Sequence, residues 1–162
     1  MQASTSDGGC TGAKTLHLQR HGQTVMNVFL SQRPYGSPGF VDPLIFDTSL
    51  TDVGVEQARN ARRKAKGLRP PPELLVVSPL SRALHTADLA FPPTLVDCPR
   101  IMHPLARERL YLSSDVGLTR SQLSKEWQHY STEYVDKEVW WYTLNKQDLK
   151  SVTLEPEGAS NL

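Results

Sequence analysis

Apolar and polar residues alternate with two different periods along the chain, and the two periods predict strands and helices in turn. A short alternation at residues 15–18 predicts a first strand, and His21 lies just beyond the carboxyl end of that strand. A continuous apolar run at residues 74–77 predicts a second, buried strand. A third strand region is predicted over residues 94–102, with residues 105–111 beyond it at the same edge.

Helical periodicity fills the segments between these strands. Thr51 is a typical N-cap, and apolar residues recur behind it at helical spacing. Pro79 directly follows the second strand and favours the start of a helix, so Arg82 falls in the first turn of that helix. Thr119 and Gln122 form a capping-box pattern that predicts a further helix. Strands that alternate with helices predict a doubly wound α/β sheet, in which ligands bind at the carboxyl ends of the strands.

The remaining segments lack a clear period. Residues 29–49 are rich in Pro, Gly and Ser, which predicts a long loop of the kind that often covers a site. Residues 134–144 form the densest aromatic region, which is either a ligand cover or, more often for such spacing, part of the core. Residues 1–14 are expected to be a disordered leader and residues 155–162 an irregular tail.

Bulk composition limits the classes of protein to consider. The chain has 162 residues, which fits one domain with a single core. Its 18 Lys and Arg nearly balance 17 Asp and Glu, so a nucleic-acid partner is not expected. No apolar run reaches the roughly 20 residues that span a bilayer, so no membrane partner is expected either. The two cysteines, Cys10 and Cys98, form no disulfide framework, which favours a cytoplasmic protein.

Three motifs in order resemble a known family. They are Leu18-Gln19-Arg20-His21-Gly22-Gln23-Thr24 with Asn27, then Leu50-Thr51-x-x-Gly54-x-x-Gln57-Ala58, then Val77-Ser78-Pro79-Leu80-Ser81-Arg82-Ala83-Leu84-His85-Thr86-Ala87. Together they resemble the histidine phosphatase superfamily, the phosphoglycerate mutase-like proteins, over roughly residues 15–108. The resemblance implies a three-layer α/β/α fold with a mostly parallel central sheet, formed by a domain at residues 15–154.

The first and third motifs carry residue types that suit phosphoryl transfer. The planar guanidinium groups of Arg20 and Arg82 can hold the oxygens of a phosphoryl group. An imidazole with one nitrogen held by a hydrogen bond can attack phosphorus with the other, and the resemblance implies this role for His21. It also implies that Thr24 and Asn27 line the phosphate pocket. The glycine that follows the histidine, Gly22, permits a close backbone approach.

Loss of an alkoxide requires a proton, and Glu108 is the candidate donor. A carboxylic acid whose pKa is raised by partial burial can supply that proton. The segment Pro104-Leu105-Ala106-Arg107-Glu108 resembles the stretch that carries the general acid of the family. The alternative is a surface carboxylate that pairs with Arg107 or Arg109.

The other histidines give no sign of a metal site. His17 is expected to alternate into the first strand, and His85 lies on a helix at a position for which the resemblance implies no catalytic role. His103 and His129 have no partners at the spacing of metal ligands. Neither a metal nor another cofactor is expected.

The chain departs from the family pattern near its end. The family uses a second histidine after a late apolar strand, and no histidine follows His129 here. We expect a fold incomplete at the C-terminus, from a splice form or fragment, rather than a complete divergent member that turns phosphate over poorly. Apolar faces left without a cover predict reduced stability or self-association through exposed apolar surface.

The leading functional hypothesis is a phosphomonoesterase-type phosphatase that forms a phosphohistidine on His21, with activity weakened by the missing second histidine. One alternative is a non-catalytic domain that binds a phosphate ligand or has a regulatory role. Another is a transferase of the phosphoglycerate mutase type. A sugar phosphate, another small phosphomonoester and a phosphoprotein all remain candidate substrates, because residues 29–49 and 116–144 carry no recognisable specificity signal.

Overall fold

The computed structural model describes residues 14–141, and the elements alternate between helix and strand along the chain. Nearly all of the expected leader and the whole expected tail lie outside these residues. The described elements, in chain order, are α1 (Val25–Gln32), α2 (Asp52–Ala65), β1 (Leu75–Val77), α3 (Ser81–Ala90), β2 (Arg100–Met102), the short 3₁₀ turns η1 (Pro104–Ala106) and η2 (Ser113–Asp115), and α4 (Arg120–Glu126). The chain is therefore an α/β protein, as the alternating periods predict.

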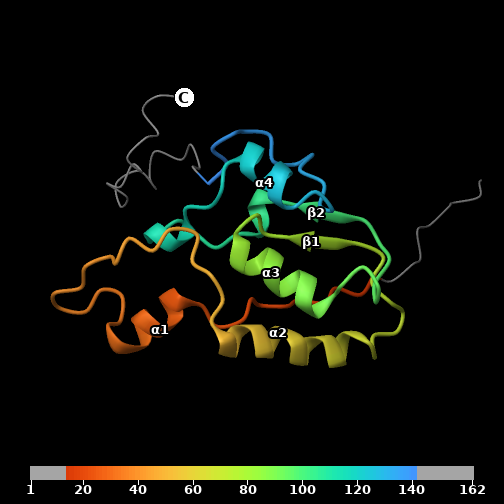
Figure 1. Cartoon of the computed structure of the whole chain (residues 1–162), viewed down its shortest axis with the longest axis horizontal. Helices are drawn as coiled ribbons and strands as arrows, with labels where there is room; N and C mark the ends of the chain where they lie inside the picture. The colour runs from red at the N-terminus through yellow and green to blue at the C-terminus, as the bar shows by residue number, and fades with distance from the viewer. Residues whose placement is uncertain (1–13, 142–162) are drawn as a thin grey trace, which may run out of the picture.

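The strands β1 and β2 form a parallel pair in which Val76 lies opposite Ile101. Ser131 extends the sheet on the far side of β2 through a parallel bridge to Ile101. Figure 1 shows the two strands between α3 and α4, with α2 beside α3 on the outer side. Helix, sheet and helix thus follow one another in layers, and the carboxyl ends of both strands lie at one edge.

The core lies between α3 and α4, around the buried ends of the two strands. Val77 and Met102 contribute the strand side chains, and both are buried. Trp140 and Trp141 pack into the same core, each 4% exposed. The aromatic region of the sequence therefore supplies core residues rather than a ligand cover as far as residue 141, and its end at residues 142–144 lies outside the described part.

The helices α2, α3 and α4 follow their predicted start signals. The Thr51 side chain caps α2 by accepting a hydrogen bond from Gly54 N, and α2 packs along α3. Helix α3 begins just after Pro79, and Arg82 lies in its first turn. Thr119 and Gln122 form the expected capping box of α4, which ends near the buried Trp127. None of the helices in the described residues is long and apolar enough to cross a membrane.

One predicted strand is wrong, and another is wrong in its first part. Residues 15–18 are not a strand, since Leu16 is 81% and Leu18 is 88% exposed and the segment pairs with no described strand. Alternation alone predicts an extended segment, whereas a strand also needs a neighbour to pair its backbone groups. Residues 94–98 form turns, and the regular strand begins only after Pro99, at Arg100. Whether the exposed leucines cause self-association stays a prediction.

Helix α1 occupies the start of the segment that was expected to be a loop. A capping box fixes its first turn, because the Thr24 hydroxyl accepts from Asn27 N and Asn27 Oδ1 accepts from Thr24 N. Met26 is the one buried residue of this helix, so its sequence lacks a clear apolar stripe. The irregular part of the segment runs from Arg33 to Ser49 and is tied to the rest of the fold by Asp42 and Asp47.

Gly54 lets the start of α2 pack directly against the segment that carries His21. A Cβ atom on Gly54 would collide with the carbonyl oxygen of Gln23, and one on Gly22 would collide with the carbonyl of Gly54. We expect Gly54→Ala to lower the free energy of unfolding by about 1–3 kcal/mol through overpacking, although alanine in a helix normally gains about 1 kcal/mol over glycine. Urea unfolding measures the change.

Gly67 provides a matched control for this substitution. A Cβ atom there has only an ordinary contact of 3.4 Å, with Lys64 O. Gly67→Ala should therefore leave the unfolding midpoint nearly unchanged. A Gly54→Ala protein as stable as the native chain would show that the two backbones can separate without cost.

Candidate functional site

His21 is held in place by the residues that follow it. Gly22 N donates to the Thr86 hydroxyl at 3.1 Å, and that hydroxyl donates to Arg82 O at 2.8 Å. Gln23 N donates to Gln57 Oε1 at 2.8 Å. The three motifs that lie apart in the sequence are thus joined by hydrogen bonds immediately next to His21.

Thr51 adds two more links between α2 and the His21 segment. Its backbone N–H donates to Gln23 O at 3.0 Å, and its hydroxyl donates to Gln23 Oε1 at 2.8 Å. Thr51, Gly54 and Gln57 of the second motif therefore position the loop rather than contact a ligand. Sequence reasoning quoted Gln57 and Thr86 within their motifs but assigned a role to neither.

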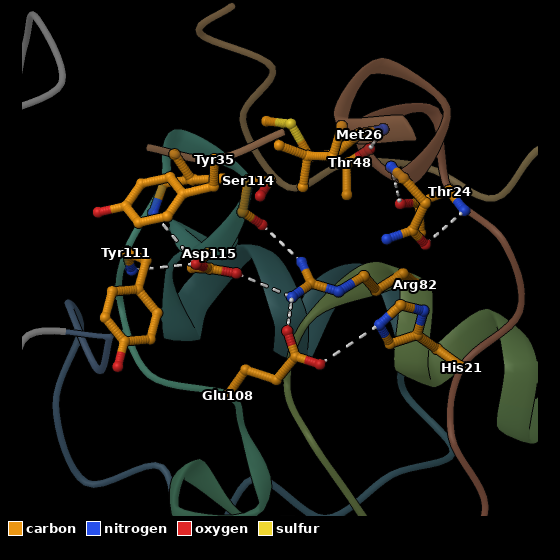
Figure 2. A pocket seen from close by; sticks show the side chains of 13 residues that line it. His21, Thr24, Met26, Tyr35, Thr48, Arg82, Glu108, Tyr111, Ser114 and Asp115 are labelled. Carbon is orange, nitrogen blue, oxygen red and sulfur yellow. Dashed lines mark hydrogen bonds and ion pairs between the residues drawn. The ribbon is translucent and has the colours of Figure 1, made fainter. Parts of the chain in front are cut away.

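A cavity of about 420 Å³ opens beside His21 at the carboxyl ends of the strands. Its walls come from the His21 segment, α1, the residue 33–49 segment, the start of α3 and residues 108–115. The residues that line it are His21, Thr24, Met26, Asn27, Leu30, Tyr35, Thr48, Arg82, Glu108, Tyr111, Leu112, Ser114 and Asp115. Figure 2 shows His21, Arg82 and Glu108 grouped at one end, and the rings of Tyr35 and Tyr111 beyond Asp115 at the other.

Arg82 is buried and held rigidly. One terminal nitrogen donates to Ser114 O at 2.6 Å, and the other donates to Asp115 Oδ1 at 2.9 Å. Asp115 is itself fixed, because its second oxygen accepts from Tyr111 N at 3.1 Å and from Leu112 N at 3.2 Å. Such a carboxylate partner orients the guanidinium group and offsets the cost of its burial.

Glu108 lies between His21 and Arg82. Its Oε1 is 3.8 Å from His21 Nε2, and its Oε2 is 3.5 Å from the Arg82 nitrogen that also binds Asp115 (Figure 2). The predicted alternative, a surface carboxylate paired with a neighbouring arginine, does not describe this placement. Arg107 instead donates to the backbone carbonyl of Glu108.

The expectation of a raised pKa for Glu108 is wrong for the ligand-free site. The protonated His21 side chain, whose Nε2 lies 3.8 Å from Glu108 Oε1, lowers the pKa of Glu108 most, and the charges of Arg82 and Arg20 lower it further, to about 2. Burial opposes this shift but does not reverse it, because the side chain is 57% exposed. Glu108 is therefore a carboxylate at neutral pH until something removes the influence of these cations.

The His21 ring is oriented by its own loop. Nδ1 lies 2.8 Å from Gly22 O, which can only accept, so Nδ1 carries the hydrogen and donates. In the neutral ring this leaves the lone pair on Nε2, the nitrogen that faces Glu108 and the cavity. In the protonated ring Nε2 carries a hydrogen directed toward Glu108, and it is this form that favours the Glu108 carboxylate. The side chain is 10% exposed, so the nucleophilic nitrogen has access to the cavity from a mostly buried position.

Thr24 and Asn27 offer hydrogen-bond donors to the same cavity. The capping box of α1 uses the oxygen of each side chain as an acceptor. This leaves the hydroxyl hydrogen of Thr24 and the amide hydrogens of Asn27 to donate elsewhere. The backbone N–H groups of the first turn of α1 already have hydrogen-bond partners. An anion at the start of this helix would therefore bind the side-chain donors of Thr24 and Asn27.

Two of the residues expected to bind phosphate do not line the cavity. Arg20 is exposed, although its charge contributes to the lowered pKa of Glu108. Gly22 is buried against Gly54, and its close approach is to that backbone.

Asp115 and Ser114 are site residues that the sequence did not suggest. They carry no motif, and their role depends on contacts with Arg82 more than thirty residues away in the sequence. Within residues 14–141 no group of three or more His, Cys, Asp or Glu side chains is placed to hold a metal ion.

Comparison with known proteins places these features in a family. The profile of the histidine phosphatase superfamily (branch 1) matches residues 16–152. Two similar proteins are phosphoglycerate mutase-like protein 2 and phosphoglycerate mutase-like protein, both from Arabidopsis thaliana. The first is 38% identical over 76 residues, covering 46% of this chain and 21% of the relative. The second is 38% identical over 80 residues, covering 48% of this chain and 28% of the relative.

These matches cover only about a fifth and just over a quarter of the lengths of the two relatives. The profile match extends over most of the present chain and includes all three motifs. The site built around His21, Arg82 and Glu108 lies within it. The chain therefore belongs to the histidine phosphatase superfamily.

Proposed function

We propose that this chain is a phosphomonoesterase that acts through a phosphohistidine on His21. The observation that carries the proposal is the position of the Glu108 carboxylate, 3.8 Å from His21 Nε2 and 3.5 Å from Arg82. An imidazole and a guanidinium group thus converge on one anion. A phosphoryl group is an anion of the same kind, with more oxygens for the same donors.

The proposed reaction has two steps. In the first, His21 Nε2 attacks phosphorus, the ester P–O bond breaks, and the departing alkoxide takes a proton from Glu108. In the second, a water molecule gives a proton to the Glu108 carboxylate as its oxygen attacks phosphorus, the N–P bond breaks with its electron pair returning to Nε2, and inorganic phosphate is released. Arg82 and the donors of Thr24 and Asn27 stabilise the charge on the transferring oxygens in both steps.

Substrate binding raises the pKa of Glu108, so that Glu108 takes up a proton from solvent before the chemical step. The pKa of Glu108 is low because His21 and Arg82 favour its charged form. A phosphate dianion that binds these two groups competes for them and adds negative charge nearby, which raises the pKa of Glu108 toward protonation. Glu108 can move aside, since its side chain is 57% exposed.

Trapping of the phosphoenzyme tests the proposal. We expect reactions with a phosphorus-labelled aryl phosphate, quenched in alkaline detergent, to leave label on the native chain that is stable in alkali and lost in acid, and to leave none on His21→Ala. His85→Ala is a suitable control, because His85 packs on Trp127 and does not line the cavity. Label that persists in His21→Ala, or aryl phosphate turnover unaffected by that substitution, contradicts the proposed nucleophile.

A transferase of the mutase type is the second candidate, favoured by the names of the two plant relatives. It shares the phosphohistidine and differs only in the acceptor of the second step. Release of inorganic phosphate at the same rate as the alcohol supports the hydrolase, whereas phosphate transfer to an added hydroxy acid supports the mutase. A non-catalytic phosphate-binding domain would bind phosphate and release no alcohol.

We also propose a cytoplasmic location, because Cys98 is an unpaired and partly exposed thiol. Recovery of the protein with the secreted fraction of its cells would contradict this.

A further inference from the structure

The cavity continues well beyond the groups assigned to phosphate. At its far end the rings of Tyr35 and Tyr111 stand at a tilt, with their centroids 6.2 Å apart. Figure 2 shows both rings on the side of the cavity away from His21. Met26, Leu30 and Leu112 add aliphatic side chains to the cavity wall. The alcohol part of the substrate therefore contacts aromatic and aliphatic side chains.

Tyr35 and Tyr111 are only half covered by the protein. Tyr35 is 59% exposed and Tyr111 is 50% exposed. Large aromatic side chains in this situation gain free energy when a ligand covers them, and flat rings gain most from another ring placed against them. An aliphatic polyol would not give this gain.

Hydrogen-bonding groups for a polyol are scarce at this end. The Thr48 hydroxyl lines the cavity and accepts a hydrogen bond from Met26 N, which leaves it one hydrogen to donate, and the two tyrosines carry further hydroxyls at this end. Asp115 uses both oxygens to hold Arg82 and the backbone of residues 111 and 112. A sugar placed here would lose hydrogen bonds to water that these residues do not replace.

The two tyrosines are held in position before any ligand binds. Asp42 accepts hydrogen bonds from Ser113 N at 2.7 Å and from the Ser113 hydroxyl at 2.6 Å, which ties the Tyr35 segment to η2. Phe40 packs edge-on against Tyr35, with centroids 5.5 Å apart. Tyr111 N donates to the carboxylate that binds Arg82. The aromatic end is thus fixed relative to the phosphate end, which reduces the entropic cost of binding.

We propose that the substrate is an aromatic phosphomonoester, whose ring binds against Tyr35 and Tyr111 while its phosphoryl group binds His21 and Arg82. This inference rests on the proposed function and narrows it, since a sugar phosphate is then disfavoured. A cavity of about 420 Å³ is within the range that small-molecule sites occupy. Tyr35 and Tyr111 determine specificity and take no part in the chemistry.

Binding of two phosphonates, measured by titration calorimetry, tests this without requiring turnover. Benzylphosphonate carries the ring, and 2,3-dihydroxypropylphosphonate carries a polyol on the same phosphonate group. We expect the native chain to bind benzylphosphonate about tenfold more tightly. In Tyr35→Ala/Tyr111→Ala that preference should disappear through weaker binding of benzylphosphonate alone. In Tyr35→Phe/Tyr111→Phe it should remain.

Tyr134→Ala is the matched control. Tyr134 is a tyrosine of similar exposure, 48%, but it stacks on His103 and does not line the cavity. Its replacement should leave both affinities unchanged. Equal affinity of the native chain for the two phosphonates, or loss of the preference in the phenylalanine variant, overturns the inference while the phosphate site stands. If neither phosphonate binds, the proposed function fails as well.

The same assay distinguishes two sources of an aromatic ester. Free phosphotyrosine represents a small molecule, and a short peptide that contains phosphotyrosine represents a protein. Both carry the ring and the phosphoryl group, so binding of either supports the aromatic class. Tighter binding of the peptide assigns a protein source, and equal or weaker binding assigns a small molecule.

Discussion

Arg82→Ala should impair both stability and phosphate binding. Arg82 is 3% exposed and pairs with the equally buried Asp115 at 2.9 Å. Its removal leaves a buried carboxylate without its cation, which lowers the free energy of unfolding by about 3–5 kcal/mol. The same change removes the guanidinium group from the cavity, so kcat/KM for an aryl phosphate should fall by about a hundred- to a thousandfold. Urea unfolding and steady-state kinetics measure the two effects.

A second substitution separates the two roles of Arg82. In Arg82→Met/Asp115→Asn the buried charge is gone, and we expect most of the lost stability to return because the remaining polar group is neutral. Phosphate binding should not return, since no guanidinium group faces His21. Arg59→Ala, on the exposed face of α2, is a control that should change neither property. Recovered activity in the double variant would make Arg82 a structural residue only.

The helices could be predicted because their signals are local. Thr51, Thr119 and Pro79 each fix the start of a helix within one turn, and the structure has those starts. The 15–18 strand could not be predicted from alternation, because a strand also depends on a partner elsewhere in the chain. Helix α1 was missed for a related reason: its capping box is local, but its pattern of buried residues is too weak to identify a helix.

The residues of the candidate site also fall into two groups, those that could be predicted from the sequence and those that could not. His21, Arg82 and Glu108 stand in motifs or near one, and the structure brings them to a common cavity. Asp115 could not be predicted, because a buried carboxylate that orients an arginine needs no particular neighbours in the chain. Arg20 was expected in the cavity because it precedes His21 in the first motif, yet its side chain is exposed to solvent and does not line the cavity.

Glu108→Gln should strengthen phosphate binding while it weakens turnover. In the ligand-free protein the Glu108 carboxylate occupies the space between His21 and Arg82, and its pKa of about 2 keeps it charged at neutral pH. A neutral amide removes this competing charge, so inorganic phosphate should bind about tenfold more tightly, a modest gain because the site is open to solvent. The amide cannot supply a proton to the alkoxide, so kcat for an alkyl phosphate should fall by about 10²- to 10⁴-fold. Calorimetry and steady-state kinetics provide the two readouts.

The unfolding free energy of the chain should depend on pH because of the Glu108 carboxylate. The pKa of Glu108 is lowered from 4.5 to about 2 on folding, so its charged form stabilises the fold above pH 4.5. That contribution is lost as the pH falls from about 4.5 toward 2, because the folded protein must then take up the proton that the unfolded chain already holds. The difference in unfolding free energy between the native chain and Glu108→Gln should therefore shrink as the pH falls over this range. Glu133→Gln is a control for an exposed carboxylate outside the cavity. A difference that does not depend on pH, together with unchanged phosphate affinity, would mean that Glu108 does not interact with His21 and Arg82 in solution.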